Sequence, residues 1–225
     1  MPAGVYGKYP GKRDFVATNV PRSVLAPLEA WLQGGMASSR ESLGRAWEGA
    51  YLVQPIWSFW IGASVTGVDC AGALVPSVDR IGRHFPLVIL AHAGPETAGL
   101  APWRRIMSSE WPASVHERLL SALGDHPPSE QQMLIDGLSD PEAADKTIPE
   151  GAAPIGNGHR IIIQGAESEP AAEAVASIHH LTCDTMRSIW WTGGSGLVPA
   201  QIVTFIGMPD ISFMAAMMSQ DGNAV

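Results

Sequence analysis

The chain has 225 residues, of which 46% are apolar and 16% charged, and its formal net charge is −8. This composition supplies a sizeable core and excludes a disordered chain. The length favours one domain, which we place at residues 1–225. No apolar run approaches the ~20 residues of a membrane span, and no hydrophobic stretch follows Lys8, Lys12 and Arg13. The sequence therefore predicts neither membrane insertion nor a secretory signal.

The cysteine content indicates the cellular compartment, and the distribution of charge limits the kinds of partner that the protein can bind. The two cysteines, Cys70 and Cys183, indicate a reducing compartment, so we expect a cytoplasmic protein. Residues 1–105 hold ten Lys and Arg against seven Asp and Glu, whereas residues 106–225 hold four against fifteen. Because the chain has only three lysines in total, nucleic acid is not an expected partner. The asymmetry fits either ordinary solvated surface or a dipolar surface that orients a charged partner.

The first third of the chain predicts a strand, two helices and three more strands. Val5–Tyr9 is expected to be a short edge strand ended by Pro10-Gly11. The spacing of Val24, Leu28, Trp31 and Leu32 predicts an amphipathic helix that Gly34-Gly35 end, and a second helix follows over Arg40–Ala50. The next strands are Ile56–Ile61, Ala71–Val75 and Phe85–Leu90. Their connections are too short for crossover helices, which predicts antiparallel pairing.

Further helices and a hairpin are expected after residue 110. A stripe of Val115, Leu119, Leu120 and Leu123 predicts a helix that Gly124 ends, and Ser129 with Gln132 suggests a capping box for another helix through Leu138. A mobile loop is predicted over residues 139–158. The remaining expected elements are a strand at Ile161–Ile163, a helix from Pro170, a hairpin of Ile189–Thr192 with Gln201–Ile206, and a helix over Ile211–Met218. This order favours an α+β fold with a central antiparallel sheet flanked by helices.

Catalytic and metal-binding patterns are weak. His179, His180 and Cys183 lack the second ligand pair that a structural zinc needs. The turn Gly193-Gly194-Ser195-Gly196 has no following lysine for a phosphate loop, and Leu197 stands where a nucleophile elbow needs glycine. We therefore predict no catalytic residues, no metal and no cofactor.

Candidate partner-binding residues lie in three segments. The first, Gly7–Phe15, contains Lys8 and places charges beside turn residues between apolar strands. Asp79 can accept hydrogen bonds from nearby backbone amides, from Arg80 or from Arg83, which fits either a turn locked by an ion pair or an arginine pair offered to a partner's carboxylates. The adjacent Trp190 and Trp191 point to opposite faces of a strand, so one can be buried while the other either anchors a partner or is covered by a helix of the same domain. The predicted binding residues are, in full, Lys8, Asp79, Arg80, Arg83, Trp190 and Trp191.

Several segments resemble the TagF (also called ImpM) family of bacterial type VI secretion accessory proteins. The fairly specific one runs from Pro76-Ser77-Val78-Asp79-Arg80 to Ile81-Gly82-Arg83-His84-Phe85-Pro86-Leu87. Weaker matches are Gly4 to Pro10, Asp14-Phe15-Val16, Trp31-Leu32-Gln33, Ala50-Tyr51-Leu52, Pro55-Ile56-Trp57, Ser188 to Thr192 and Gly207-Met208-Pro209. The chain departs from the family pattern at Arg13, where many relatives have glycine before the Asp-Phe pair.

The resemblance implies a cytoplasmic negative regulator of type VI secretion that acts after translation by binding a forkhead-associated scaffold protein. It also implies a longin-like sandwich and no enzymatic activity, since the phosphatase domain fused to some relatives is not expected here. Two alternatives stay open: a structural or assembly subunit of the secretion machine, or an uncharacterised hydrolase centred on Ser195 or Asp79. The sequence leaves the oligomeric state open.

Overall fold

The computed structural model describes residues 2–94, 106–107, 109–141, 153–155, 158–162 and 187–219. Within them, one antiparallel sheet runs in the order β2-β1-β5-β4-β3-β8-β9-β7-β6. The strands are β1 (Ala3–Lys8), β2 (Phe15–Thr18), β3 (Trp57–Ile61), β4 (Cys70–Val75), β5 (Leu87–His92), β6 (Ala153–Ile155), β7 (Gly158–Ile162), β8 (Arg187–Thr192) and β9 (Gln201–Ile206). The predicted α+β fold with antiparallel pairing is confirmed.

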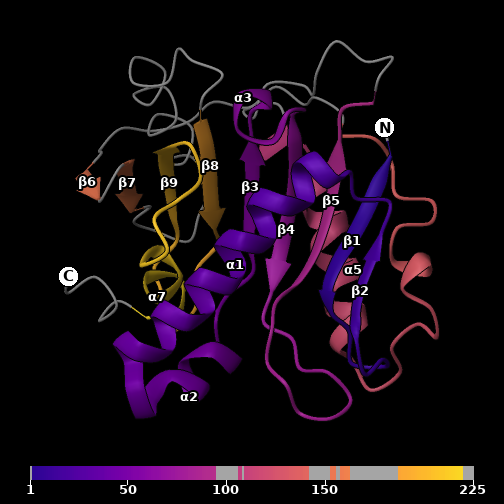
Figure 1. The fold of residues 1–225 in the computed structure, drawn as a ribbon, viewed down its shortest axis with the longest axis horizontal. Helices are drawn as coiled ribbons and strands as arrows, with labels where there is room; N and C mark the ends of the chain where they lie inside the picture. Colours follow the sequence, from indigo (N-terminus) through magenta and orange to yellow (C-terminus); the bar gives the residue numbers. More distant parts are fainter. Residues whose placement is uncertain are drawn as a thin grey trace.

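Helices lie on both faces of this sheet, with α1 crossing one face and α5 behind the other (Figure 1). α7 packs on α1, and α5 packs on β4 and β5. The helical elements are α1 (Arg22–Leu43), η1 (Gly44–Ala46), α2 (Trp47–Leu52), α3 (Ala63–Thr66), α5 (Trp111–Leu123), η2 (Gln131–Leu134) and α7 (Phe213–Met218). Among these described helices, none is both long enough and apolar enough to cross a membrane.

Two hydrophobic cores follow from this layering, because successive strand residues point to opposite faces. The core under α1 contains Leu28, Phe59 and Trp190, and the core under α5 contains Ile89 and Val115. With both faces covered, every residue of β4 and β5 is buried. These two central strands form a fixed base for the loop that joins them.

Helix α1 is longer than predicted, because Gly34 and Gly35 lie inside it instead of ending it. A Cβ atom on Gly35 would lie 2.9 Å from the Cβ of Met214 in α7. Gly35 thus lets α7 approach α1 closely, and Gly34 leaves room for Ile211 just before α7, which is a tertiary role that local propensity does not reveal. The helix predicted over Arg40–Ala50 is correspondingly the end of α1, then η1 and the start of α2.

Other predictions need correction in the first two thirds of the chain. β1 is not an edge strand, because it pairs with both β2 and β5. Leu120 and Leu123 of α5 are exposed, unlike Val115 and Leu119. The helix predicted from Ser129 to Leu138 is only η2, and the hydroxyl of Ser129 donates to the sulfur of Met133 instead of capping a helix.

The C-terminal predictions are mostly confirmed where the structure describes the chain. β8 and β9 form the predicted hairpin with Thr192 opposite Gln201, and the last helix starts at Phe213 instead of Ile211. β6 pairs with β7 inside the loop predicted over 139–158, so that prediction is wrong at Ala153–Ile155 and at Gly158. Residues 142–152 and 156–157 of that loop, the helix from Pro170, and His179, His180 and Cys183 lie outside the described residues.

Candidate functional site

Two connections of the sheet meet at one end of the molecule, at the bottom in Figure 1. They are the turn between β1 and β2 (residues 9–14) and the loop between β4 and β5 (residues 76–86). The backbone amide of Arg80 donates to the carbonyl oxygen of Lys12 at 3.1 Å, and the guanidinium of Arg83 donates to the carbonyl oxygen of Arg13. The strongest sequence motif is therefore joined to the N-terminal turn.

The tip of the β4–β5 loop is a tight turn organised by Asp79. The amide of Gly82 donates to the carbonyl oxygen of Asp79 at 2.9 Å, and the amide of Asp79 donates to the carbonyl oxygen of Arg83 at 3.1 Å. Gly82 has φ +86°, a conformation that glycine adopts without strain. Oδ1 of Asp79 accepts from the amides of Ile81 at 3.0 Å and Arg83 at 2.9 Å, so the carboxylate satisfies the turn's own donors.

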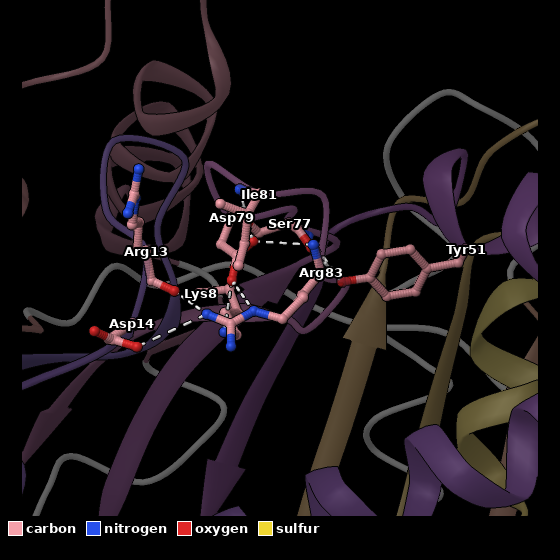
Figure 2. Close-up of polar contacts among 8 residues, drawn as sticks. All are labelled: Lys8, Arg13, Asp14, Tyr51, Ser77, Asp79, Ile81 and Arg83. Carbon is pink, nitrogen blue, oxygen red and sulfur yellow. Dashed lines mark hydrogen bonds and ion pairs between the residues drawn. The ribbon is translucent and has the colours of Figure 1, made fainter.

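The other carboxylate oxygen of Asp79 joins two cations, as Figure 2 shows. Oδ2 of Asp79 lies 2.6 Å from Nζ of Lys8 and 2.7 Å from Nε of Arg83. The side chains of Lys8 and Asp79 are 4% and 0% exposed, whereas that of Arg83 is 50% exposed. Burial acts to raise the pKa of Asp79, but the hydrogen bonds from Lys8, from Arg83 and from the amide of Ile81 outweigh it and hold that pKa well below its usual range. The carboxylate is therefore permanently charged at neutral pH.

Lys8 reaches this carboxylate because Gly7 lets β1 run close to the β4–β5 loop. Gly7 has φ +125°, and a Cβ atom there would lie 1.9 Å from the carbonyl oxygen of Pro86. Any other residue at position 7 would push β1 away from the loop. Nζ of Lys8 also lies 4.4 Å from the centre of the Phe15 ring, which adds a cation–π contact.

A second anchor holds the base of the β4–β5 loop. The hydroxyl of Tyr51 in α2 donates to the carbonyl oxygen of Ser77 at 2.9 Å and accepts from the amide of Ser77 at 2.8 Å (Figure 2). Burial raises the pKa of Tyr51, so the phenol stays neutral and keeps its proton for this bond. His84 lies edge-on to the rings of Trp47 and Tyr51. The loop is thus fixed at its base as well as at its tip.

The predicted binding residues separate into three groups. Lys8, Asp79 and Arg83 are brought together, and Arg80 is exposed on the same turn. Lys8 and Asp79 are buried, so in this structure they support Arg83 and present no surface of their own. Trp190 is fully buried in the core, with its ring 4.7 Å from that of Trp31, and is also not accessible to a partner. Trp191 is half-buried on the opposite face of β8, away from the arginines.

Sequence reasoning missed four residues of this site: Arg13, Asp14, Tyr51 and Ser77. Arg13 and Asp14 contact the guanidinium of Arg83 from the β1–β2 turn, with Oδ1 of Asp14 3.8 Å from a terminal nitrogen of Arg83. The hairpin signal Pro10-Gly11 was present, but its neighbour in space depends on β1 pairing with β5. Tyr51 and Ser77 stand in segments that resemble the TagF family, and that was their only signal.

The geometry of this site favours binding over catalysis. Both oxygens of Asp79 are fully engaged, by two amides and two side-chain cations, which leaves no free lone pair to take a proton from a substrate. The hydroxyl of Ser195 accepts from the amide of Leu197 and so caps its own turn. Within the described residues, no group of three or more His, Cys, Asp and Glu side chains could hold a metal ion.

One further serine has a base beside it. Oγ of Ser58 in β3 lies 2.7 Å from Nε2 of His116 in α5. Burial lowers the pKa of His116, but Ser58 is only 1% exposed beneath the helix. Ser58 therefore has no route to a substrate, and the bond ties α5 to the sheet.

Comparisons with known proteins agree with the family resemblance. A family model described as the TagF N-terminal domain, type VI secretion system-associated, matches residues 4–135. The crystal structure of PA0076 from Pseudomonas aeruginosa PAO1 superposes with a TM-score of 0.75 at 28% sequence identity, covering 100% of this chain and 97% of that one. No protein in the curated set matches. On the family match and the shared fold, the chain belongs to the TagF family of type VI secretion-associated proteins.

Proposed function

We propose that this protein is a cytoplasmic negative regulator of type VI secretion, and that it acts after translation by binding a forkhead-associated scaffold protein of the secretion system. Membership of the TagF family supports the link to secretion. The single observation that supports binding is the way Arg83 is held. Its Nε is fixed on a buried carboxylate, while half of its side chain stays in solvent.

This arrangement is suited to recognition. Burying the Lys8–Asp79 pair costs several kcal/mol of desolvation for each ion, which the mutual attraction repays only when the geometry is good. The result is a guanidinium group with restricted motion. Binding of a partner therefore costs little additional side-chain entropy at Arg83. Arg80 and Arg83 are the contact residues in this proposal, and Lys8 and Asp79 are positioning residues.

Co-purification tests the proposal. The full-length protein is expressed at native level in a strain with an active secretion system, captured, washed with salt and analysed by mass spectrometry. We expect a forkhead-associated protein of the same cluster in near-stoichiometric amount. Overexpression should lower the release of secreted components without lowering their cellular levels, which separates action after translation from an effect on expression. A folded bait that recovers no forkhead-associated protein would contradict the proposal.

The assembly-subunit alternative gives a different result in the same preparation. A structural subunit would co-purify with components of the secretion machine at fixed stoichiometry, and its deletion would abolish secretion. Deletion of a negative regulator should instead leave secretion intact or raise it. Comparing secretion in the deletion strain with that in the overexpressing strain therefore separates the two functions.

A further inference from the structure

We infer that the exposed end of the β4–β5 loop recognises an acidic segment of its partner that carries an apolar side chain beside its carboxylates. This inference rests on the proposed function, since it describes how the forkhead-associated protein is bound. The surface, which we name the arginine tip, consists of Arg13, Asp14, Phe15, Arg80, Ile81 and Arg83.

The arginine tip is positively charged in a negatively charged protein. It holds three arginines against the single carboxylate of Asp14, while the whole chain has a net charge of −8. The nearby Lys12 adds nothing to this excess, because it pairs with Glu130 at 2.9 Å. Within the described residues, the side chains of Arg13 and Arg80 form no ion pair of their own. An acidic segment is thus attracted to this end and repelled by much of the remaining surface.

Arg83 presents a preorganised hydrogen-bonding edge. Its Nε is occupied by Asp79, and one terminal nitrogen donates to the carbonyl oxygen of Arg13. The other terminal nitrogen has no protein acceptor among the described residues. The competing carboxylate of Asp14 is 3.8 Å away and 96% exposed, so it is a loose partner that an incoming carboxylate can replace. Guanidinium groups bind carboxylates with paired hydrogen bonds when held in this way.

Two apolar side chains flank these arginines. Ile81 occupies the corner of the turn and is 56% exposed, and Phe15 is 47% exposed. The Phe15 ring cannot turn inward, because Phe85 packs against it with ring centres 4.8 Å apart. An isolated exposed apolar residue is ordinary, but two held on a rigid turn among arginines have the mixed composition of an interface centre.

The size of the arginine tip favours a polypeptide over a nucleic acid. A nucleic-acid backbone needs a continuous basic stripe along several phosphates. Here the three arginines are bordered by the carboxylates of Asp14 and Glu130, and their neighbours are apolar. A short acidic and apolar segment of a protein matches that pattern.

The first experiment measures binding of the full-length protein to the full-length forkhead-associated protein by calorimetry, at low and high ionic strength. Arg80→Glu and Ile81→Asp are the informative variants, because both residues are exposed and neither side chain forms a hydrogen bond or ion pair within the described residues, so both variants should fold. Each is expected to weaken binding at least about tenfold, and raising the salt should weaken the wild-type complex.

Two controls match these variants. Leu120→Asp changes a residue of α5 that is exposed to the same 56% as Ile81, and Arg22→Glu reverses an exposed charge at the start of α1. Both should bind like wild type. If the wild-type protein binds and neither Arg80→Glu nor Ile81→Asp changes the affinity, the assignment of the arginine tip is wrong and the proposed function stands. No wild-type complex at all would overturn the proposed function and this inference with it.

A second measurement tests the chemistry of the occupant. A photo-crosslinking residue replaces Ile81, and the crosslinked peptide of the forkhead-associated protein is identified by mass spectrometry. We expect a peptide with clustered Asp or Glu beside an apolar residue, and no such product from a crosslinker at Leu120. A crosslink to a peptide without acidic residues would overturn the inferred chemistry.

Discussion

Two hairpin connections leave the same end of the sheet and are fixed by opposite means. The β4–β5 loop (residues 76–86) is held by charges, with the carboxylate of Asp79 at its centre. The β8–β9 turn (residues 193–200) is held by hydrogen bonds between neutral groups, such as the one from the amide of Ser195 to the carbonyl oxygen of Val198 at 2.7 Å, and it is so closely packed that a Cβ atom on Gly194 would lie 2.6 Å from the amide nitrogen of Ala200. Neutral hydrogen bonds close one turn, whereas a buried carboxylate closes the other, and we assign the charges at Asp79 to displaying Arg83 as well.

The largest expected effect is loss of the charge at Asp79. Asp79→Asn leaves Nζ of Lys8 buried without its counter-charge, so the free energy of unfolding should fall by about 3–5 kcal/mol in urea titrations. The matched control is Asp14→Asn, which alters a carboxylate that is 96% exposed and should change stability by less than about 0.5 kcal/mol. If the two variants were equally stable, the ion pair would not be what fixes the loop.

The two turn glycines should differ in the next test. Gly194→Ala combines a positive φ with a steric clash and should lower the free energy of unfolding by roughly 2–4 kcal/mol. Gly82→Ala also has a positive φ but no atom within 4 Å of the new methyl, so it should lose only about 1–2 kcal/mol. Chemical unfolding of both variants would show this order, and a reversed order would contradict the account of how each turn is held.

The anchor at the base of the β4–β5 loop should have a moderate effect. Tyr51→Phe keeps the ring in place but leaves the amide of buried Ser77 without its acceptor, while the carbonyl oxygen of Ser77 still accepts from the amide of Phe85. The free energy of unfolding should therefore fall by about 1–3 kcal/mol. Proteolysis within residues 76–86 should also become faster. Unchanged stability with unchanged cleavage would show that Tyr51 only fills space.

The smallest expected effect is the loss of stability in acid, measured over an accessible pH range. The pKa of Asp79 is lower in the folded state than its ordinary value of about 3.9, so the unfolded chain binds more protons at this group. Its contribution to stability is fully present above pH ~4 and is lost as the pH falls from there toward the lowered pKa. Below pH ~4, the free energy of unfolding of the wild type should fall more steeply with decreasing pH than that of Asp79→Asn. Parallel curves would contradict the lowered pKa.

Contacts close in the sequence could be predicted, and contacts across the sheet could not. The bonds from Asp79 to the loop amides and to Arg83 were expected, since they span four residues or fewer. Nζ of Lys8 reaches Asp79 across 71 residues, and that contact depends on β1 lying beside β5, which no local pattern specifies.

The same dependence on contacts distant in the sequence explains which secondary-structure predictions were right and which were wrong. The spacing of β3, β4 and β5 fixed their antiparallel order, because short connections permit little else. Gly34 and Gly35 have the local signature of a helix end, and their role in packing against Ile211 and Met214 depends on tertiary contacts that the sequence does not show. The capping pattern at Ser129 was a local signal without enough apolar surface behind it to stabilise a full helix.

The pairing of β1 with β5 has a consequence for how the protein is made. The arginine tip draws its residues from the first fifteen positions and from positions 80–83, and they meet only after β1 has docked beside β5. A nascent chain that has emerged only through β1 and β2 holds Arg13 but none of the surface that surrounds it. If the arginine tip binds the partner as we propose, binding competence arises together with folding of the N-terminal half, and we expect unfinished or misfolded copies not to compete for that partner.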